Sequence, residues 1–361
     1  MHIVCSKEKL TENINLVLKA VSKKKLMPVL ECILLKADGT LKMYSNDLEM
    51  AIETAPIEAD ILTEGSVALE AGMLSDIVKR LPEDNVIINV EDNITYIKSG
   101  RAEFKIIGNP DEFPPLPQVE KLTKYTLSGE EFKNMIRQTI FSVAITDEKP
   151  VYTGELLEIE DNILNLVAVD NFRVSKRTIP IESEENFKVV VPGKTLEELS
   201  KILPKKDINI YFSPKHVLFE MEQCILISRL LEGEFLQYKQ VFNQDYGTVV
   251  YTTPGELLQA LERSMIISTE LKKTIVKINV ETDKLSLTST GYAGNLYDEI
   301  DIQMEGEPLE IWFNPKYLTD VLKVIDLEEI VIYFNTNLSP CIISGKETEA
   351  YKYLILPIRP E

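Results

Sequence analysis

The chain has 361 residues, with 39 Lys and Arg against 58 Asp and Glu, so its formal net charge is −19. Its length fits two or three domains, and 44% apolar residues can form buried cores, which excludes a wholly disordered chain. No window approaches about 18 uncharged apolar residues, and the charged start MHIVCSKEKL is unlike a signal peptide. We therefore expect a cytoplasmic protein.

A predicted unit of one helix followed by one strand occurs three times along the chain. The segments 72–90, 194–212 and 316–334 align without gaps, since 194 − 72 = 122 and 316 − 194 = 122. Each has apolar residues at i, i+3 and i+7, which predicts one face of a helix. Alternating apolar residues follow and predict a strand. The matched apolar residues are Leu74, Ile77 and Leu81; Leu196, Leu199 and Leu203; and Leu318, Val321 and Ile325.

A second helix opens each repeat, at 7–21, 129–143 and 254–268. Between the helices, alternating runs form predicted hairpins, with turns at Asp38-Gly39, at Ser99-Gly100 and near Pro214. Helices with one apolar stripe must cover a sheet. The sequence therefore predicts an α+β fold of three repeated domains, 1–122, 123–247 and 248–361.

Signals of catalysis are weak. The four cysteines are far apart, form no C-x-x-C pair and fit buried thiols. Only two histidines, His2 and His216, are present, which disfavours a zinc site or a histidine-based triad. Phosphate-binding and nucleophile-elbow motifs are missing. Asp170-Asn171 after the strand 164–169 favours a turn over a catalytic carboxylate. We predict no catalytic residues, no metal and no cofactor.

One repeat position on the predicted helices always carries a lysine: Lys79, Lys201 and Lys323. Three such lysines along one surface would suit phosphate binding without sequence readout. The alternative is a pair within each helix, because an acidic residue precedes each lysine by three positions. Other basic residues on or beside these helices favour the first interpretation: Lys23, Lys24, Lys25, Arg80, Arg137, Lys194, Arg263 and Lys316.

The net charge of −19 argues against nucleic acid, whose usual partners are basic. Net charge is a sum, however, and a protein can be basic on one surface and acidic elsewhere. Two functions from different classes therefore stay open: a DNA-binding protein, and a repeat-built acidic interaction scaffold that does not bind DNA. An enzyme using a cysteine is a more distant third hypothesis.

The motifs NDLEMAI (46–52), VAVDNFRV (167–174), LLEGEFLQYKQVF (230–242) and the terminal YLILPIRPE occur in this order among the three repeats. In these features the whole chain resembles the bacterial sliding clamp, the β subunit of DNA polymerase III. The resemblance implies three domains of the DNA-clamp fold, with helices on an inner face and antiparallel sheets outside. It implies a ring-shaped head-to-tail homodimer without enzymatic activity that encircles duplex DNA independently of sequence and tethers the polymerase.

The resemblance also implies a cleft that binds short linear peptides of the polymerase, the clamp loader and other DNA enzymes. Carried over position by position, we call its residues the predicted cleft set: Tyr152, Val169, Asn171, Phe172, Arg173, Val174, Leu236, Gln240, Val241, Asn314, Tyr317, Leu338, Pro340, Leu356, Pro357, Ile358 and Arg359. This chain departs from many relatives at Asn171-Phe172, at Leu236 and at the Pro360-Glu361 end. These departures bear on the preferred peptide.

Two further sets complete the expected sites. The DNA-facing set is Lys23, Lys24, Lys25, Lys79, Arg80, Arg137, Lys149, Lys194, Lys201, Arg263, Lys316 and Lys323. By the resemblance, the dimer interface joins Phe104 and Ile106 of one chain to Ile266 and Ile267 of the other, flanked by Arg101 and Asp298.

Overall fold

The computed structural model describes residues 1–22, 27–146, 149–183, 185–242, 245–268, 274–292 and 294–359. The chain forms two compact units: Met1–Glu130 with Glu198–Leu230, and Glu131–Glu197 with Leu231–Glu361. The predicted middle domain therefore contributes residues to both units, and the predicted boundaries at 122 and 247 stay a prediction. Among the described residues, no helix is long and apolar enough to cross a membrane.

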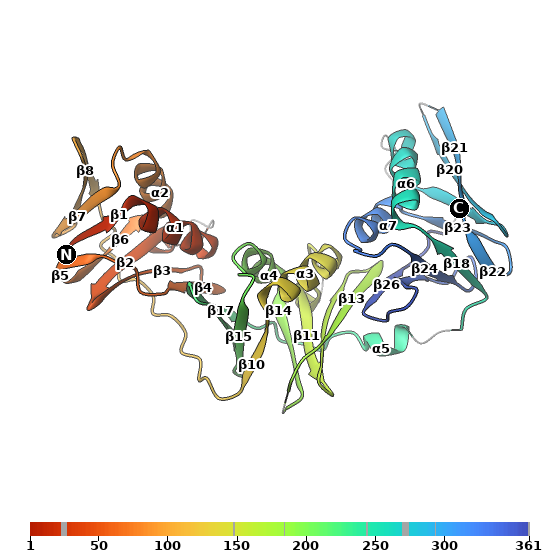
Figure 1. The fold of residues 1–361 in the computed structure, drawn as a ribbon, viewed down its shortest axis with the longest axis horizontal. Coiled ribbons are helices and arrows are strands. Elements are labelled where there is room, and N and C mark those ends of the chain that lie inside the picture. Colours follow the sequence, from red (N-terminus) through yellow and green to blue (C-terminus); the bar gives the residue numbers. More distant parts are fainter. Residues whose placement is uncertain are drawn as a thin grey trace. The chain divides into compact units, whose positions relative to one another are not determined.

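The first unit holds two antiparallel sheets (Figure 1). The five-stranded sheet has the order β5 (Asp60–Thr63), β1 (His2–Ser6), β7 (Asn85–Glu91), β8 (Ile94–Ser99) and β9 (Ala102–Ile107). The eight-stranded sheet has the order β10 (Lys124–Ser128), β15 (Asp207–Phe212), β16 (His216–Glu220), β17 (Cys224–Arg229), β4 (Met50–Thr54), β3 (Thr40–Asn46), β2 (Cys32–Asp38) and β6 (Gly65–Glu70).

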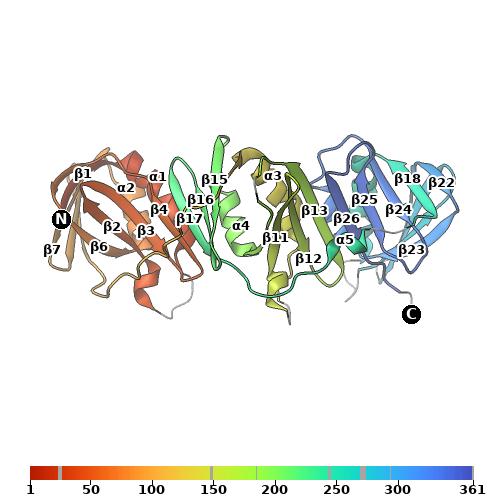
Figure 2. The same cartoon turned by 90° about the horizontal axis from the view of Figure 1, so that it is seen from below.

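The second unit also holds two antiparallel sheets. The nine-stranded sheet has the order β14 (Phe187–Pro192), β11 (Gly154–Glu160), β12 (Ile163–Val169), β13 (Arg173–Pro180), β26 (Tyr351–Ile355), β25 (Cys341–Gly345), β24 (Ile330–Phe334), β18 (Thr248–Thr252) and β22 (Gln303–Gly306). The four-stranded sheet has the order β21 (Gly294–Asp301), β20 (Lys284–Gly291), β19 (Val276–Val280) and β23 (Leu309–Phe313). Figure 2 shows β13, β26, β25 and β24 side by side.

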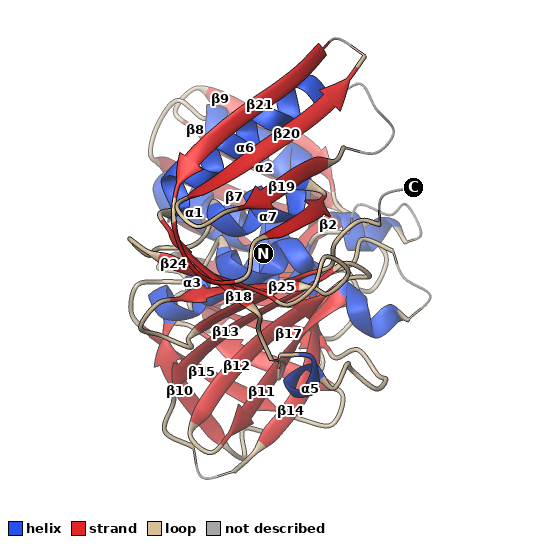
Figure 3. Cartoon of the chain, turned by 90° about the vertical axis from the view of Figure 1, so that its right-hand side faces the viewer, coloured by secondary structure: helices blue, strands red, loops and turns tan. Residues whose placement is uncertain are grey.

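Helices pack in pairs against these sheets. In the first unit α1 packs on α2, and in the second α6 packs on α7. Helix α6 also lies beside the hairpin β20–β21 (Figure 3). The helices are α1 (Lys7–Val17), α2 (Ala71–Arg80), α3 (Gly129–Thr139), α4 (Gly193–Ser200), α5 (Tyr238–Val241), α6 (Pro254–Ser268) and α7 (Pro315–Leu322). Short 3₁₀ helices are η1 (Leu18–Ala20), η2 (Pro28–Glu31), η3 (Ile140–Ser142) and η4 (Pro150–Thr153).

The predicted apolar stripes and hairpins are confirmed. All nine matched apolar residues of the helix repeat are buried, and each repeat helix is followed by its strand, β7, β15 or β24. The hairpin turns contain Gly39 at φ +64° and Gly100 at φ +55°. Positive φ is strained for residues with a Cβ, which explains why glycine stands at both turns.

Helix ends are where the prediction was wrong. The α-helical parts of 7–21 and 129–143 stop at Val17 and Thr139 and continue as the 3₁₀ helices η1 and η3. Helix α4 ends at Ser200 and α7 at Leu322, so Lys201 and Lys323 follow these helices directly.

A buried carboxyl group links α3 to the nine-stranded sheet. Glu155 of β11 is fully buried, and its Oε2 accepts a hydrogen bond from Thr139 Oγ1 at 2.6 Å. Its other oxygen has no hydrogen-bond partner among the described residues. Burial raises the pKa of Glu155 from 4.5 to about 8; the nearby Glu197 adds to the rise, and the Thr139 bond opposes it. The fold therefore favours the protonated acid.

We predict that Glu155→Gln stabilises the protein at alkaline pH. A raised folded-state pKa means that the unfolded chain loses its proton first, so wild-type stability falls as pH rises from 4.5 through about 8. The neutral amide does not titrate, so at pH 9 the variant should exceed wild type by about 2–4 kcal/mol in free energy of unfolding. Urea titrations at pH 6 and pH 9 measure this difference. Parallel pH dependence of both proteins would contradict the prediction.

Candidate functional site

A tight turn between β12 and β13 forms the centre of the predicted cleft set. Asp170 Oδ1 accepts hydrogen bonds from the backbone N–H groups of Phe172 at 2.8 Å and Arg173 at 2.9 Å. The backbone N–H of Asp170 also donates to the carbonyl of Arg173 at 3.1 Å. The turn expected at Asp170-Asn171 is confirmed, and the carboxylate is occupied in holding it.

Arg173 is a buried anchor of this turn, with 9% of its surface exposed. Its Nε donates to Asp170 Oδ2 at 3.0 Å, its Nη1 donates to Asp320 Oδ2 of α7 at 2.7 Å, and its Nη2 donates to the carbonyl of Phe141. The guanidinium also lies 4.7 Å from the ring centre of Tyr317 and 5.2 Å from that of Phe141. Arg173 therefore joins β13, η3 and α7.

Phe172 lies outside this anchor. Its side chain is 50% exposed and stacks on Tyr317, with ring centres 5.6 Å apart and ring planes 21° apart. The backbone carbonyl of Phe172 accepts a hydrogen bond from Leu356 N at 2.8 Å. Two residues later, Ile358 N donates to the carbonyl of Trp312 at 2.7 Å. The C-terminal segment is thus fastened alongside the turn.

An apolar cluster brings other members of the set together. Tyr152, Leu236 and Val241 are partly buried against a core that includes Val169 and Val174. Leu236 precedes α5 and Val241 ends it. The hydroxyl of Tyr238, the first residue of α5, donates to the buried carboxylate of Glu158 on β11. A neighbouring carboxylate disfavours the phenolate, so burial and Glu158 raise the pKa of Tyr238 above its usual range. This hydrogen bond fixes α5 to the sheet.

The remaining members are placed less closely. Asn314 caps α7, with its Oδ1 accepting a hydrogen bond from Lys316 N at 3.0 Å. Pro340 and Pro357 are partly buried, whereas Asn171, Gln240, Leu338 and Arg359 are exposed. Their membership of one cleft stays a prediction.

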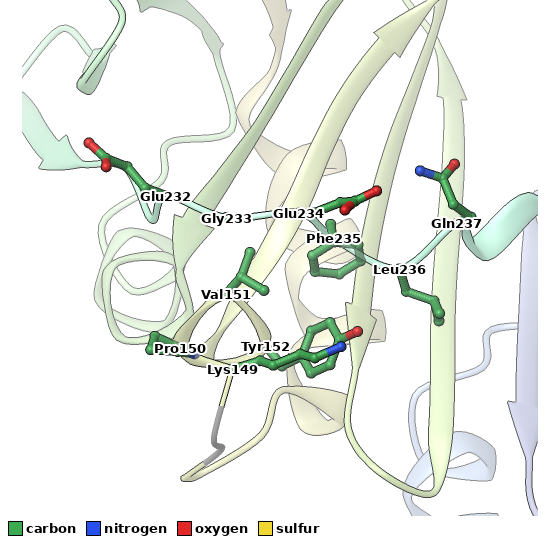
Figure 4. Close-up of a pocket in the computed structure, with 10 residues that line it drawn as sticks. All are labelled: Lys149, Pro150, Val151, Tyr152, Glu232, Gly233, Glu234, Phe235, Leu236 and Gln237. Carbon is green, nitrogen blue, oxygen red and sulfur yellow. The ribbon is translucent and has the colours of Figure 1, made fainter.

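A pocket of about 540 Å³ opens beside Tyr152 and Leu236 (Figure 4). Its apolar part includes Val151 and Phe235, and the rings of Tyr152 and Phe235 meet edge to face with centres 5.7 Å apart. The residues that line it are Lys149, Pro150, Val151, Tyr152, Glu232, Gly233, Glu234, Phe235, Leu236 and Gln237. Only Tyr152 and Leu236 belong to the predicted cleft set. We assigned Lys149 to the DNA-facing set, and the structure places it in this pocket.

The lysines of the repeat position differ in their partners. Lys201 forms the predicted pair with Glu198, at 2.8 Å. Lys323 instead pairs with Glu262 at 3.0 Å, and Asp76 pairs with Arg80 rather than with Lys79, at 2.8 Å. The pairing alternative is therefore right at Lys201 and wrong at the other two positions. Lys79 is exposed and has no hydrogen bond or ion pair among the described residues.

Other members of the DNA-facing set also lie beside carboxylates. Arg137 pairs with Asp326, Lys316 with Asp320 at 2.9 Å, and Arg263 with Asp298 at 2.6 Å. Lys194 is exposed. Lys23, Lys24 and Lys25 lie outside the described residues. The basic side chain of each pair stays exposed, so it can be drawn to other anions.

The residues expected at a dimer interface lie on or beside two sheet edges. Strand β9 ends the five-stranded sheet and β21 ends the four-stranded sheet. Phe104 is 36% exposed on β9, and Ile266 is 73% exposed near the end of α6, next to the partly buried Ile267. Ile106 is partly buried, Arg101 is exposed, and Asp298 is engaged with Arg263 of its own chain.

The surroundings of the cysteines do not support the hypothesis of an enzyme that uses a cysteine. All four cysteines are buried free thiols, as predicted, and burial raises the pKa of Cys5 to about 11 and of Cys341 to about 12. A thiol with a raised pKa is a poor nucleophile near neutral pH. The described part of the chain holds no group of three or more His, Cys, Asp or Glu side chains that could bind a metal ion.

Comparison with known proteins covers the whole chain. Family models described as the N-terminal, central and C-terminal domains of the DNA polymerase III beta subunit match residues 1–117, 126–237 and 239–359. A beta sliding clamp of Halalkalibacterium halodurans is 35% identical, over 99% of this chain and 100% of its own. The beta sliding clamp of Bacillus subtilis is 34% identical with the same coverage. The chain belongs to the bacterial beta sliding clamp family.

Solved structures of this clamp family have the same fold as this chain. A putative DNA polymerase III beta subunit from Eubacterium rectale has a TM-score of 0.96 at 39% identity, and the Bacillus subtilis sliding clamp has 0.97 at 33% identity. Both comparisons cover 100% of each chain. The family and the three clamp domains expected from the sequence are confirmed, and the family is one of non-catalytic polymerase subunits.

Most residues that line the pocket were missed by sequence reasoning. Motif transfer gave Tyr152 and Leu236, but not their neighbours Val151, Glu234 and Phe235. One signal was present: GEFLQY (233–238) lies 122 residues after DEFPPL (111–116), so Phe235 matches Phe113 at the end of the preceding repeat. A repeated aromatic residue indicates a packing position, and the structure indeed buries Phe235.

We predict that Arg173→Ala destabilises the second unit far more than a matched exposed change. The substitution leaves Asp170 and Asp320, both largely buried, without their main cation, and should cost about 3 kcal/mol. Arg80→Ala removes an exposed pair with Asp76 and should cost less than about 1 kcal/mol. Urea denaturation of both variants tests this. Equal midpoints would show that Arg173 is not an anchor.

Proposed function

We propose that this protein is the sliding clamp of a bacterial replicative DNA polymerase. In this proposal two chains close head to tail into a ring, which encircles duplex DNA without reading its sequence and keeps the polymerase on its template. The observation that carries the proposal is the full-length match, domain by domain, to proteins named beta sliding clamp. A scaffold that never meets DNA is not favoured by this match.

Unpaired sheet edges support the homodimer. Strands β9 and β21 each end a sheet and expose apolar side chains, including Ile107 at 80% and Tyr297 at 63%. Exposed apolar edges invite pairing with another chain. Because β9 and β21 belong to different ends of the sequence, pairing one with the other is a heterologous contact, which generates a ring when the rotation closes.

The basic residues of the repeat support DNA contact. Lys79, Lys201 and Lys323 stand at one repeat position and are exposed. Phosphate contacts from such side chains supply affinity without sequence information. Held by a closed ring, the DNA does not require tight contacts, and weak ones leave it free to slide.

The predicted cleft set supports binding of short linear peptides. The apolar cluster around Tyr152 and Leu236, the turn at Phe172 and the C-terminal segment at Leu356 all belong to the second unit. Apolar grooves with a few polar groups at the rim suit extended peptides. We propose that the polymerase, the clamp loader and other DNA enzymes of the cytoplasm bind here through peptides with a glutamine and two large apolar residues.

We predict that the protein, loaded on nicked circular DNA by a clamp loader, is retained on the circle and slides off once it is cut open. The triple variant Lys79→Glu, Lys201→Glu, Lys323→Glu should be retained several-fold less at low salt, because phosphate contacts are lost. The difference should shrink as salt rises. Retention is measured by gel filtration of the loaded DNA.

A charge-matched variant serves as the control. Lys36, Lys206 and Lys346 are exposed and paired to carboxylates, but they do not occupy the repeat position. Their triple change to Glu alters the net charge equally and should leave retention unchanged. If both triple variants behave alike, the repeat lysines do not contact DNA; if wild type also stays on linear DNA, the ring proposal fails.

We predict that Ile266→Ala with Ile267→Ala converts a dimer into folded monomers. At the proposed contact each buried apolar side chain contributes at most about 1.5–3 kcal/mol. Native mass spectrometry at nanomolar concentration should therefore give about twice 41.0 kDa for wild type and 41.0 kDa for the double variant. Leu122→Ala, at an exposed apolar residue outside both edges, should leave the dimer intact. A dimeric double variant would refute the interface.

A further inference from the structure

The pocket beside the cleft is not accounted for by the predicted cleft set. It shares Tyr152 and Leu236 with that set and extends beyond them along two segments, 149–152 and 232–237. Its volume of about 540 Å³ lies within the range of about 300–1,000 Å³ that is usual for ligand sites. A peptide lying on Tyr152 and Leu236 can therefore continue into it.

The rim of the pocket is acidic. Three charged side chains line it: the carboxylates of Glu232 and Glu234 and the ammonium group of Lys149. Both glutamates are exposed, and within the described chain neither has a hydrogen bond or an ion pair. In Figure 4 Glu234 stands next to Phe235, whereas Glu232 lies at the outer edge and points away from Tyr152. A net negative rim attracts cations and disfavours phosphates.

One wall already accommodates a cation. The ammonium nitrogen of Lys149 lies 5.4 Å from the ring centre of Tyr152. An ammonium or guanidinium group over an aromatic face is stabilised by the ring quadrupole. Lys149 shows that the Tyr152 face takes a cation, and the Glu234 carboxylate at the rim adds an opposite charge for an incoming basic side chain.

We propose that this pocket binds a lysine or arginine side chain next to the apolar residues of a partner peptide. The proposal rests on the peptide cleft proposed above and adds to it the chemistry of the flanking residue. Apolar contact with Val151 and Leu236 holds the aliphatic stem, and the charged end reaches Glu234. Glu232 adds to the negative field at the entrance.

Fluorescence anisotropy with a fixed set of labelled peptides tests the proposal on the full-length protein. The core peptide has six residues, with a glutamine and two large apolar side chains. Extended versions carry Lys-Lys or Ala-Ala at the N-terminus or at the C-terminus. We expect Lys-Lys at one end to tighten binding about three- to fivefold over Ala-Ala at low salt. The gain should decline as salt rises.

Variants separate this inference from the cleft itself. Glu234→Gln, alone and with Glu232→Gln, should abolish the gain from Lys-Lys and leave the dissociation constant of the core peptide unchanged. Glu182→Gln, at an exposed carboxylate that does not line the pocket, should keep the gain. Leu236→Asp should weaken every peptide.

The outcomes differ for the two proposals. If the core peptide binds but Lys-Lys gives no gain at either end, or if the gain survives in the double glutamine variant, the basic-residue pocket is wrong and the cleft stands. If the core peptide does not bind wild type at all, the cleft proposal fails and the pocket proposal fails with it.

Discussion

Strand β13 pairs with β26 through five residue pairs, from Arg173 with Ile355 to Arg177 with Tyr351. This ladder joins the strands that follow α3 to those that follow α7 in a single nine-stranded sheet. Buried side chains continue across it, because Val174 lies in one cluster with Ile342 and Leu354. The turn at 170–173 and the C-terminal segment at 356–358 directly continue the two paired strands, so the ladder decides that they meet. A ligand there would meet a largely pre-formed wall, which limits the ordering cost of binding.

The buried ion pairs beside this ladder assign different roles within the predicted cleft set. Burying the Arg173 guanidinium is costly unless it is paired, and Asp170, Asp320 and the Phe141 carbonyl each accept one hydrogen bond from it. A guanidinium so engaged positions the turn and has little left to offer a peptide. Phe172 and Leu356 are half exposed or nearly so, and they are the side chains that a ligand can reach. Arg173 and Phe172 thus belong to one motif but have different roles.

The repeat made much of the fold predictable from the sequence. Three copies of one helix pattern, separated twice by the same offset of 122 residues, place Leu74, Leu196 and Leu318 at equivalent buried positions. What the sequence did not reveal depends on residues far apart in the chain. Asp320 looked like the partner of Lys323, but Arg173 and Lys316 bind it instead, since β13 brings Arg173 to α7. The pocket likewise needs two segments, 149–152 and 232–237, whose approach no local pattern encodes.

The acidic total charge becomes compatible with DNA once the ion pairs are considered. Lys201, Lys316, Lys323 and Arg263 each lie against a carboxylate of the same chain. The cation of each pair is exposed, so at the proposed DNA contact a phosphate can take it over, and the carboxylate can recapture it when the phosphate moves on. The net gain per contact is then small. A ring that holds its DNA by enclosure needs only small gains in binding free energy from each contact. Small gains also keep the free-energy barrier between neighbouring positions on the duplex low enough for sliding.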